Sequence, residues 1–166
     1  MYNIGDRIVY PMHGAGIIES IEEREILGSK QSYYVLKIPV GSMKVMIPIA
    51  NVENIGVRDV IEPSVADKVF LRFKSQDVVQ KEANWNKRYR ENMEKLKTGD
   101  IFEVSDVVNA LMVRERDKGL STGERKMLNN AKQILISEIV LAKGIEQEDV
   151  EHAMNDYIYN NKAKAQ

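Results

Sequence analysis

The single tryptophan of the sequence lies beside basic residues, and this combination can bind nucleic acid. Trp85 follows Asn84, a good helix N-cap, and the next turn carries Lys87, Arg88 and Arg90. Lysine and arginine neutralise phosphates and gain affinity mostly by counterion release, which makes binding salt-dependent. An exposed indole can stack on a base or wedge against an opened base step, worth about 1–3 kcal/mol per stacked base. The alternative interpretation is a core tryptophan with a solvated basic face.

Charge is unevenly distributed along the 166 residues, although the formal net charge is only −1. Residues 81–98 and 114–132 each carry six basic and three acidic side chains, whereas residues 145–161 carry five acidic side chains and no lysine or arginine. A weakly basic middle is therefore masked by an acidic end. Solvated helix faces would explain the same distribution, so charge alone does not decide between the two interpretations.

No motif in the sequence supports catalysis. The two histidines, His13 and His152, lie in different predicted domains, and neither belongs to an H-x-x-x-H or H-E-x-x-H pattern. The segment 14–16 is too short for a dinucleotide fingerprint, and the sequence contains no P-loop. Cysteine is absent, which excludes disulfides and thiolate metal sites. We therefore expect no enzymatic activity, no cofactor and no metal site.

The composition is that of a folded, non-membrane protein. Hydrophobic residues make up 43% and charged residues 30% of the chain, which argues against disorder. No apolar run approaches the roughly 18 residues that span a bilayer. The N-terminus lacks the basic and then apolar layout of a signal peptide. We expect a cytoplasmic protein.

Short runs of β-branched and aromatic residues, separated by glycines, fill residues 1–62. The runs cover residues 7–10, 17–21, 32–38 and 43–48. Their spacing predicts four or five short antiparallel strands of a small barrel. In the last run, alternation places Lys44 and Met46 on one face and Val45 and Ile47 on the other. A domain of this size is marginal but can fold alone.

The hydrophobic period becomes helical after Glu62, which predicts an all-α domain over residues 63–166. The predicted helices begin near Pro63, Asn84, residues 103–106, Ser121 and Gln147. Proline suits a first helical position, and Ser121 with Glu124 forms a predicted capping box. The fold class is therefore α+β with two domains, which join around residues 57–64 without a long flexible tether.

An ordered set of motifs resembles the CarD/CdnL family of bacterial RNA polymerase-binding transcription regulators. The motifs are GDRIVYPMHG (5–14), YVLK (34–37), VRDV (57–60), NWNKRY (84–89), EKLKTGD (94–100), LSTGERKML (120–128) and AKQIL (131–135). Each motif is short, but the colinear set from about residue 2 to residue 143 is specific to the family. Beyond Lys143 the resemblance fades, and we assign no function to the acidic last helix.

The resemblance implies a Tudor-like, SH3-like N-terminal barrel, related to the polymerase-binding module of transcription-repair coupling factors. In the family this module binds the β subunit of RNA polymerase. Arg24 matches a family arginine at that contact, and we place Lys44 and Met46 in the same contact. Met46 stands where other members can carry a second arginine. A methionine can still pack in an apolar contact, but the family's charge pairing is in question there.

By the same resemblance, the helical domain reaches promoter DNA at the upstream edge of the transcription bubble. Trp85 would wedge into the minor groove, and basic side chains would hold nearby phosphates. These side chains are Lys87, Arg88, Arg90, Arg125, Lys126 and Lys132. The expected result is a longer-lived open promoter complex with little sequence specificity. We expect the protein to act as a monomer.

Two other classes of function remain open. The first is a peptide-binding interaction module without DNA contact, in which Tyr10, Tyr33 and Tyr34 form an aromatic cage for a methylated lysine. Strand packing explains these tyrosines more simply. The second is an enzyme of unrecognised type, which rests on no motif.

Overall fold

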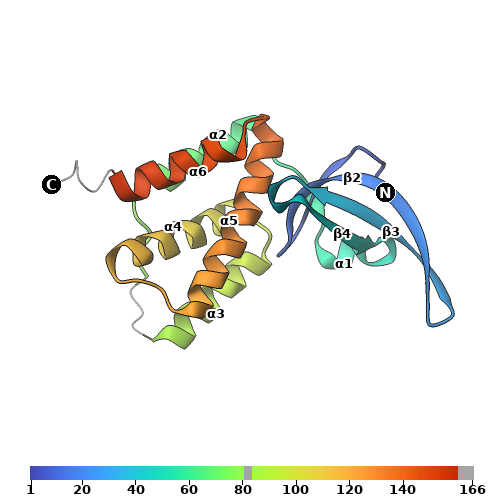
Figure 1. Ribbon diagram of the computed structural model, residues 1–166, viewed down its shortest axis with the longest axis horizontal. Helices are drawn as coiled ribbons and strands as arrows, with labels where there is room; N and C mark the ends of the chain where they lie inside the picture. Colours follow the sequence, from blue (N-terminus) through green and yellow to red (C-terminus); the bar gives the residue numbers. More distant parts are fainter. Residues whose placement is uncertain (81–83, 161–166) are drawn as a thin grey trace.

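The computed structural model describes residues 1–80 and 84–160 and places a β domain beside a helical domain (Figure 1). The strands are β1 (Arg7–Tyr10), β2 (Gly14–Ile26), β3 (Ser29–Ile38), β4 (Met43–Pro48) and β5 (Arg58–Asp59). The helices are α1 (Val52–Ile55), α2 (Pro63–Ser75), α3 (Trp85–Lys97), α4 (Ile101–Asp117), α5 (Thr122–Lys143) and α6 (Gln147–Asn155). Short 3₁₀ turns lie at Val40–Ser42 and Ile49–Asn51, and a π-helical turn lies at Asp156–Asn160.

The five strands form one antiparallel sheet in the order β4-β3-β2-β1-β5. On its inner face Ile18, Tyr34, Leu36 and Ile47 are fully buried, because alternate residues of each strand point to the same side. The sheet and the helices that follow it confirm the predicted order of a small antiparallel β domain and an all-α domain.

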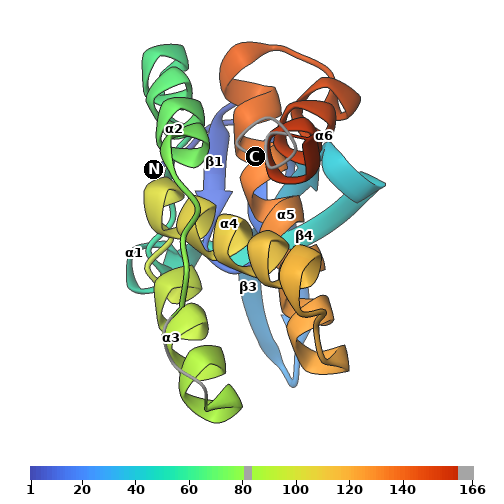
Figure 2. The ribbon, with the colours of Figure 1, turned by 90° about the vertical axis from the view of Figure 1, so that its left-hand side faces the viewer.

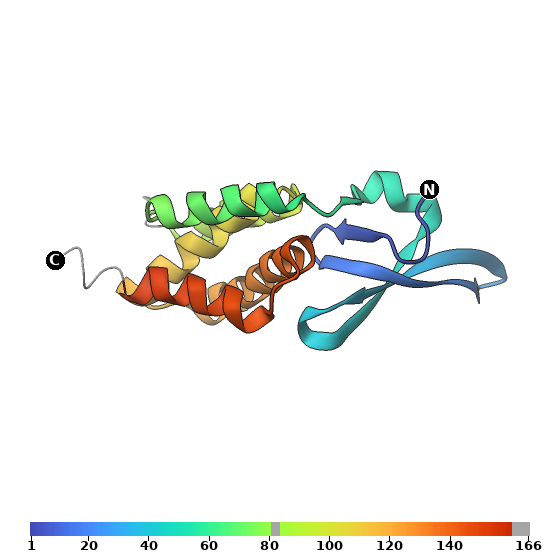
Figure 3. The same cartoon turned by 90° about the horizontal axis from the view of Figure 1, so that it is seen from above.

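Strands β2 and β3 extend beyond their neighbours as a two-stranded ribbon, seen from above in Figure 3. Their pairing continues to Ile26 and Ser29, whereas β4 stops pairing with β3 at Pro48. At the ribbon tip Leu27 is fully exposed. The sequence predicted the two strands but not this extension, because nothing in a single strand's alternation reports how long its neighbours are.

Helix α4 crosses the middle of the helical domain, with α2 and α3 on one side and α5 and α6 on the other (Figure 2). Its buried residues, among them Val104, Val107, Val108 and Leu111, centre the largest hydrophobic core. The predicted start of this helix at residues 103–106 is wrong by a few residues. Asp100 caps the helix instead, because its carboxylate accepts hydrogen bonds from two backbone N–H groups that would otherwise lack partners in the first turn.

The other boundaries show where periodicity is weakest. Helix α1 was not predicted, because four residues are too short to reveal a period. The last predicted helix changes to a π-helical turn at Asp156, and both pieces together reach Asn160. In the part of the chain that the structure describes, no helix is both long and apolar enough to cross a membrane.

The two domains are joined by a bonded interface as well as by the chain. The Arg58 guanidinium forms a bidentate ion pair with the Glu138 carboxylate of α5, with both N···O distances at 2.7 Å. The Arg7 guanidinium donates to the Leu141 carbonyl at 2.6 Å, and the backbone N–H of Ala15 donates to the buried Ser137 hydroxyl at 2.9 Å. These bonds hold the β domain against the C-terminal half of α5.

Candidate nucleic-acid and polymerase interfaces

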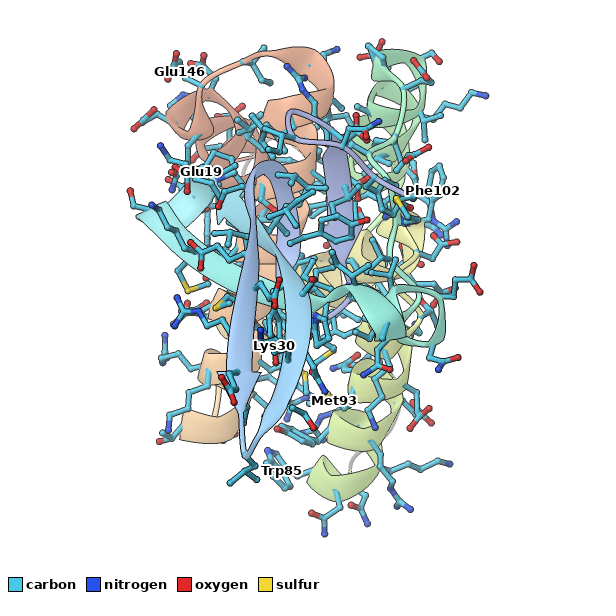
Figure 4. All side chains as sticks on the ribbon, turned by 90° about the vertical axis from the view of Figure 1, so that its right-hand side faces the viewer. Glu19, Lys30, Trp85, Met93, Phe102 and Glu146 are labelled. Atoms are coloured by element: carbon cyan, nitrogen blue, oxygen red, sulfur yellow. The ribbon has the colours of Figure 1, made fainter. Side chains whose placement is uncertain are left out.

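Trp85 is the first residue of α3 and lies at the surface, with 40% of its side chain area exposed. Its ring stacks on Tyr89 with a centroid distance of 5.1 Å and an angle of 24°. Its indole N–H donates to the Ser121 hydroxyl oxygen, 2.9 Å away at the start of α5. Figure 4 shows Trp85 at one extremity of the helical domain, with Glu146 at the other. The core-tryptophan alternative therefore does not describe this structure.

Asn84 positions Trp85 by capping α3. Its side-chain oxygen accepts hydrogen bonds from the backbone N–H groups of Asn86 and Lys87, at 2.9 and 3.3 Å. This satisfies two donors that a helix start leaves without intrahelical partners. The predicted N-cap is confirmed, and it fixes the tryptophan at the exact residue where the backbone enters the helix.

Four of the predicted phosphate contacts are exposed cations on α3 or α5. Lys87 and Arg90 lie on α3 and border an open groove of about 490 Å³. Arg125 and Lys126 lie on the first turns of α5, close after the Ser121 that holds Trp85. Arg125 is paired with Glu115 at 2.8 Å, so part of its charge is already compensated.

Arg88 does not lie on this surface, and its predicted phosphate contact is wrong as the structure places it. Only 2% of the residue is exposed, and its guanidinium lies 3.6 Å from the Glu124 carboxylate of α5. A side chain this buried cannot reach a phosphate. Arg114 of α4 lies 3.9 Å from the other oxygen of the same carboxylate. Arg88 therefore ties α3 to α5 beneath Trp85.

Lys132 lies apart from the other predicted DNA contacts. It is half-buried and borders a cavity of about 330 Å³ whose lining includes Val40, Gly41 and Glu151. It follows Lys126 by six residues, which is about 9 Å along a helix. The structure therefore brings Trp85 together with the cations of the α3 and α5 starts, and leaves Lys132 nearer the domain junction.

The three predicted polymerase contacts share the outer face of the sheet. Leu36 and Ile47 point into the core, so Lys44 and Met46 of β4 point outward by alternation, which agrees with the prediction that these two share one face. Arg24 of β2 points outward as well, because it is three residues after Ile21, whose strand partner is the buried Tyr34. The three residues lie in different rows of the sheet, with Arg24 on the extended ribbon.

Both charged members of this outer face have local ion-pair partners. Arg24 lies 3.0 Å from Glu22 and Lys44 lies 3.0 Å from Glu19, and all four side chains are substantially exposed. Exposed pairs of this kind contribute little to stability, about 0–1 kcal/mol each. They can therefore exchange partners at low energetic cost when an acidic surface approaches.

Several described groups have shifted pKa values, and three of them lie away from the Trp85 end and the outer face of the sheet. Burial raises the pKa of Tyr2, and the nearby Asp59 adds to that effect. A hydrogen bond to Asp117 raises the pKa of Arg116, and another to Asp106 raises the pKa of Arg72. Each of these shifts raises a pKa that already lies well above 7, so none of these three groups exchanges its proton near pH 7. Among the described residues, no cluster of acidic or histidine side chains is arranged to hold a metal ion.

Comparison with known proteins supports a single family for both domains of the chain. Residues 2–61 match the family model of the CarD-like/TRCF RID domain, and residues 68–155 match that of the CarD C-terminal domain. A protein of Bacillus subtilis (strain 168), described as putative transcription factor YdeB, is 43% identical over 150 residues, which cover 90% of this chain and 97% of that protein. The chain belongs to the CarD family.

A solved structure is also similar to this CarD-family chain. It is the solution NMR structure of the 72-residue N-terminal domain of Myxococcus xanthus CarD, which is 32% identical in sequence. The match covers 36% of this chain and 79% of that one, with a TM-score of 0.32. The two family models and the Bacillus subtilis relative confirm the predicted family, and the family models confirm the class of a Tudor-like domain followed by a helical domain. The CarD family is one of transcription regulators, and its RID is an RNA polymerase-interacting domain.

Sequence reasoning missed Ser121 and Glu124 as parts of the Trp85 site. They were predicted only as a capping box, and the Ser121 hydroxyl does accept the Glu124 backbone N–H at 3.2 Å. The Glu124 carboxylate is buried between Arg88 and Arg114, a role that no local pattern announces. The available signal was that the capping box and the helix start at Asn84 are both rich in cations, but their proximity emerges only in the fold.

Proposed function

We propose that this CarD-family protein binds the β subunit of RNA polymerase through the outer face of its sheet and promoter DNA through the Trp85 end of its helical domain. The DNA contact lies at the upstream edge of the transcription bubble, where Trp85 wedges into the minor groove. The outcome is a longer-lived open promoter complex.

One observation carries the DNA part of the proposal. A partly exposed indole, fixed in orientation, lies at the meeting point of two helix starts that carry exposed cations. The cations are Lys87, Arg90, Arg125 and Lys126. Phosphate contacts from such side chains position a protein without reading sequence, and a stacked aromatic ring favours strand-separated DNA. Arg88 is assigned to positioning Trp85, and Lys132 is at most a peripheral contact.

The energetics fit a regulator that acts only in a complex with polymerase. A ligand shifts a conformational equilibrium only by its differential affinity for the two states. One stacked base contributes about 1–3 kcal/mol, which corresponds to roughly 5- to 150-fold in the lifetime of the open state. Tethering through the β domain raises the local DNA concentration, so the helical domain does not need a strongly basic surface.

The aromatic-cage alternative loses support from the geometry. Tyr34 is 1% exposed, and its hydroxyl accepts a hydrogen bond from the Tyr2 backbone N–H at 3.0 Å. Tyr33 is its neighbour in β3 and therefore points to the opposite face of the sheet. Tyr10 stacks on His13, with 4.0 Å between ring centroids. The three tyrosines do not converge on one cage.

The decisive experiment for the DNA contact is a measurement of open-complex lifetime with purified polymerase and the Trp85→Ala protein. We expect the lifetime gained from the protein to fall by roughly 5- to 150-fold, the equivalent of one stacked base. Leu71→Ala is the matched control, because Leu71 is an exposed apolar side chain on α2. A folded Trp85→Ala protein that supports the full lifetime would refute the wedge.

The polymerase contact is tested separately by pull-down of polymerase with the full-length chain. Arg24→Glu reverses a charge on the outer face of the sheet and should reduce capture. Lys68→Glu reverses an exposed charge on α2 and should not. Equal capture by both variants would remove Arg24 from the contact without touching the DNA part of the proposal.

A further inference from the structure

The indole N–H of Trp85 is already committed inside the protein. It donates to Ser121 Oγ at 2.9 Å, across 36 residues of sequence. The same oxygen accepts the Glu124 backbone N–H at 3.2 Å, and the Ser121 hydroxyl donates to Glu124 Oε1 at 3.3 Å. A serine hydroxyl has one hydrogen and two lone pairs, so these three contacts use its whole hydrogen-bonding capacity.

Glu124 sets the direction in which the Ser121 hydroxyl points. The carboxylate is 2% exposed and lies between Arg88 and Arg114, which hold it at 3.6 and 3.9 Å. Because Glu124 Oε1 takes the hydroxyl hydrogen, the lone pairs of Ser121 are left to face Trp85 and the backbone N–H of Glu124. The buried charges beneath the surface therefore orient the acceptor that holds the indole.

Gly123 leaves the space that the six-membered ring of the indole occupies at Cζ2 and Cη2. A Cβ atom at this position would lie 3.2 Å from Cζ2 and 3.9 Å from Cη2 of Trp85, closer than a relaxed contact at the first of these atoms. The backbone of Gly123 is helical and does not require glycine. Glycine weakens a helix relative to alanine, so its presence in the first turn of α5 is explained by the ring that packs on it.

We propose that Ser121 and Gly123, supported by Glu124, form an orientation clamp for Trp85. With one ring face on Tyr89 and the N–H on Ser121, the indole presents only its remaining face and edge to DNA. The tryptophan then makes an apolar stacking contact and donates no hydrogen bond to a base. Recognition at this position therefore depends on an opened base step and tolerates different bases. This inference rests on the proposed DNA contact and specifies its chemistry.

The clamp can be tested in the full-length protein, because the single tryptophan makes intrinsic fluorescence a direct report on Trp85. Ser121→Ala removes the acceptor and should lower the fluorescence anisotropy and shift the emission to longer wavelength. It should also shorten the open-complex lifetime about fivefold, the equivalent of one hydrogen bond. Ser121→Thr keeps a hydroxyl and should restore both properties.

Two further variants separate the clamp from simple capping. Asp100→Ala removes the N-cap of α4 at the far end of α3, so it should reduce stability and leave Trp85 fluorescence unchanged. Gly123→Ala keeps the Ser121 cap but pushes on the indole, and it should change both fluorescence and lifetime. Fluorescence and lifetime that stay unchanged in Ser121→Ala or in Gly123→Ala would overturn the clamp.

The outcomes also distinguish the clamp from the proposed function. If Trp85→Ala leaves the open-complex lifetime unchanged, the DNA contact fails whatever the fluorescence of the Ser121 variants shows. If Trp85→Ala shortens the lifetime and Ser121→Ala does not, the DNA contact stands and the clamp fails.

Discussion

Helix α5 carries a serine and a buried glutamate near each end, and the two pairs are bonded differently. Near the C-terminal end, Glu138 accepts two hydrogen bonds from Arg58 at 2.7 Å and a third from the Ile61 backbone N–H at 3.0 Å. The neighbouring Ser137 accepts the Ala15 backbone N–H at 2.9 Å. All of these contacts link the helix to the β domain or to the segment that leaves it.

At the N-terminal end the contacts of the buried glutamate are longer. Glu124 lies 3.6 Å from Arg88 and 3.9 Å from Arg114, and its Oε2 atom has no hydrogen-bond partner among the described residues. Ser121 holds a partly exposed side chain, Trp85, where Ser137 holds a buried backbone group. The buried glutamate is therefore closely bonded at the first end and held at longer distances at the second, the slack end.

The contrast fits the two tasks that the proposal gives to the helix. The 22 residues of α5 span about 33 Å and connect the β domain to the Trp85 end (Figure 1). A wedge is useful only if the distance and angle from the polymerase contact are fixed, which requires a rigid junction. The wedge itself has to present its indole in one orientation, which Ser121 and Gly123 favour at the other end of the helix. One helix combines both properties.

The largest effect is expected at the closely bonded end. Arg58→Ala leaves the Glu138 carboxylate buried without its cationic partner, which should reduce the free energy of unfolding by about 3–5 kcal/mol in urea denaturation. Arg72→Ala is the control, because Arg72 is exposed and its ion pair with Asp106 lies at the surface. This variant should reduce the free energy of unfolding by about 1 kcal/mol or less. If the two variants lose similar amounts of free energy of unfolding, the Arg58–Glu138 pair is no more important to stability than an exposed ion pair.

This junction shows what the sequence could and could not reveal. The pattern around Val57–Val60 was read as a family motif, and the change from β to helical periodicity near Glu62 marked the two domains. The partner of Arg58 lies 80 residues later, inside an apolar helix, where Glu138 carries no local signature. Ion pairs between distant segments depend on packing that periodicity does not encode.

A smaller effect is expected at the slack end. Glu124→Gln keeps the size of the side chain and an acceptor for Ser121 but removes the charge between Arg88 and Arg114. We expect a loss of about 1–3 kcal/mol in the free energy of unfolding, less than for Arg58→Ala because the contacts are longer. The same denaturation measurement checks it. A loss as large as that of Arg58→Ala would show that the two ends are equally rigid.

Helix α3 explains why Arg88 was misassigned. Trp85, Tyr89, Met93 and Leu96 recur at three- and four-residue steps. The fully buried positions of the helix are Arg88, Asn92 and Leu96. The two sets share Leu96, but Arg88 and Asn92 each precede an apolar residue by one position, which is about 100° around a helix. Polar residues can occupy the buried stripe because partners on other segments satisfy them, as Gln80 does for Asn92 at 2.9 Å. Trp85 can be singled out from the sequence because its type and its basic neighbours are local features.

The smallest effect on stability, with the most specific effect on binding, is expected from a surface charge at the slack end. Lys126→Gln should change the free energy of unfolding by no more than about 0.5 kcal/mol. In polymerase complexes on a forked duplex it should reduce the slope of log affinity against log salt by about 0.9, the value of one phosphate contact.

Lys143→Gln is the matched control for Lys126→Gln, because Lys143 is the last residue of the same helix and pairs with Asp67. If α5 contacts DNA at its N-terminal end alone, only the Lys126 variant should change the salt slope. Equal changes in both variants would mean that DNA runs along the whole length of α5. The closely bonded end would then contact DNA as well as the β domain. Unchanged slopes in both would remove Lys126 from the contact and leave Trp85 with the α3 cations alone.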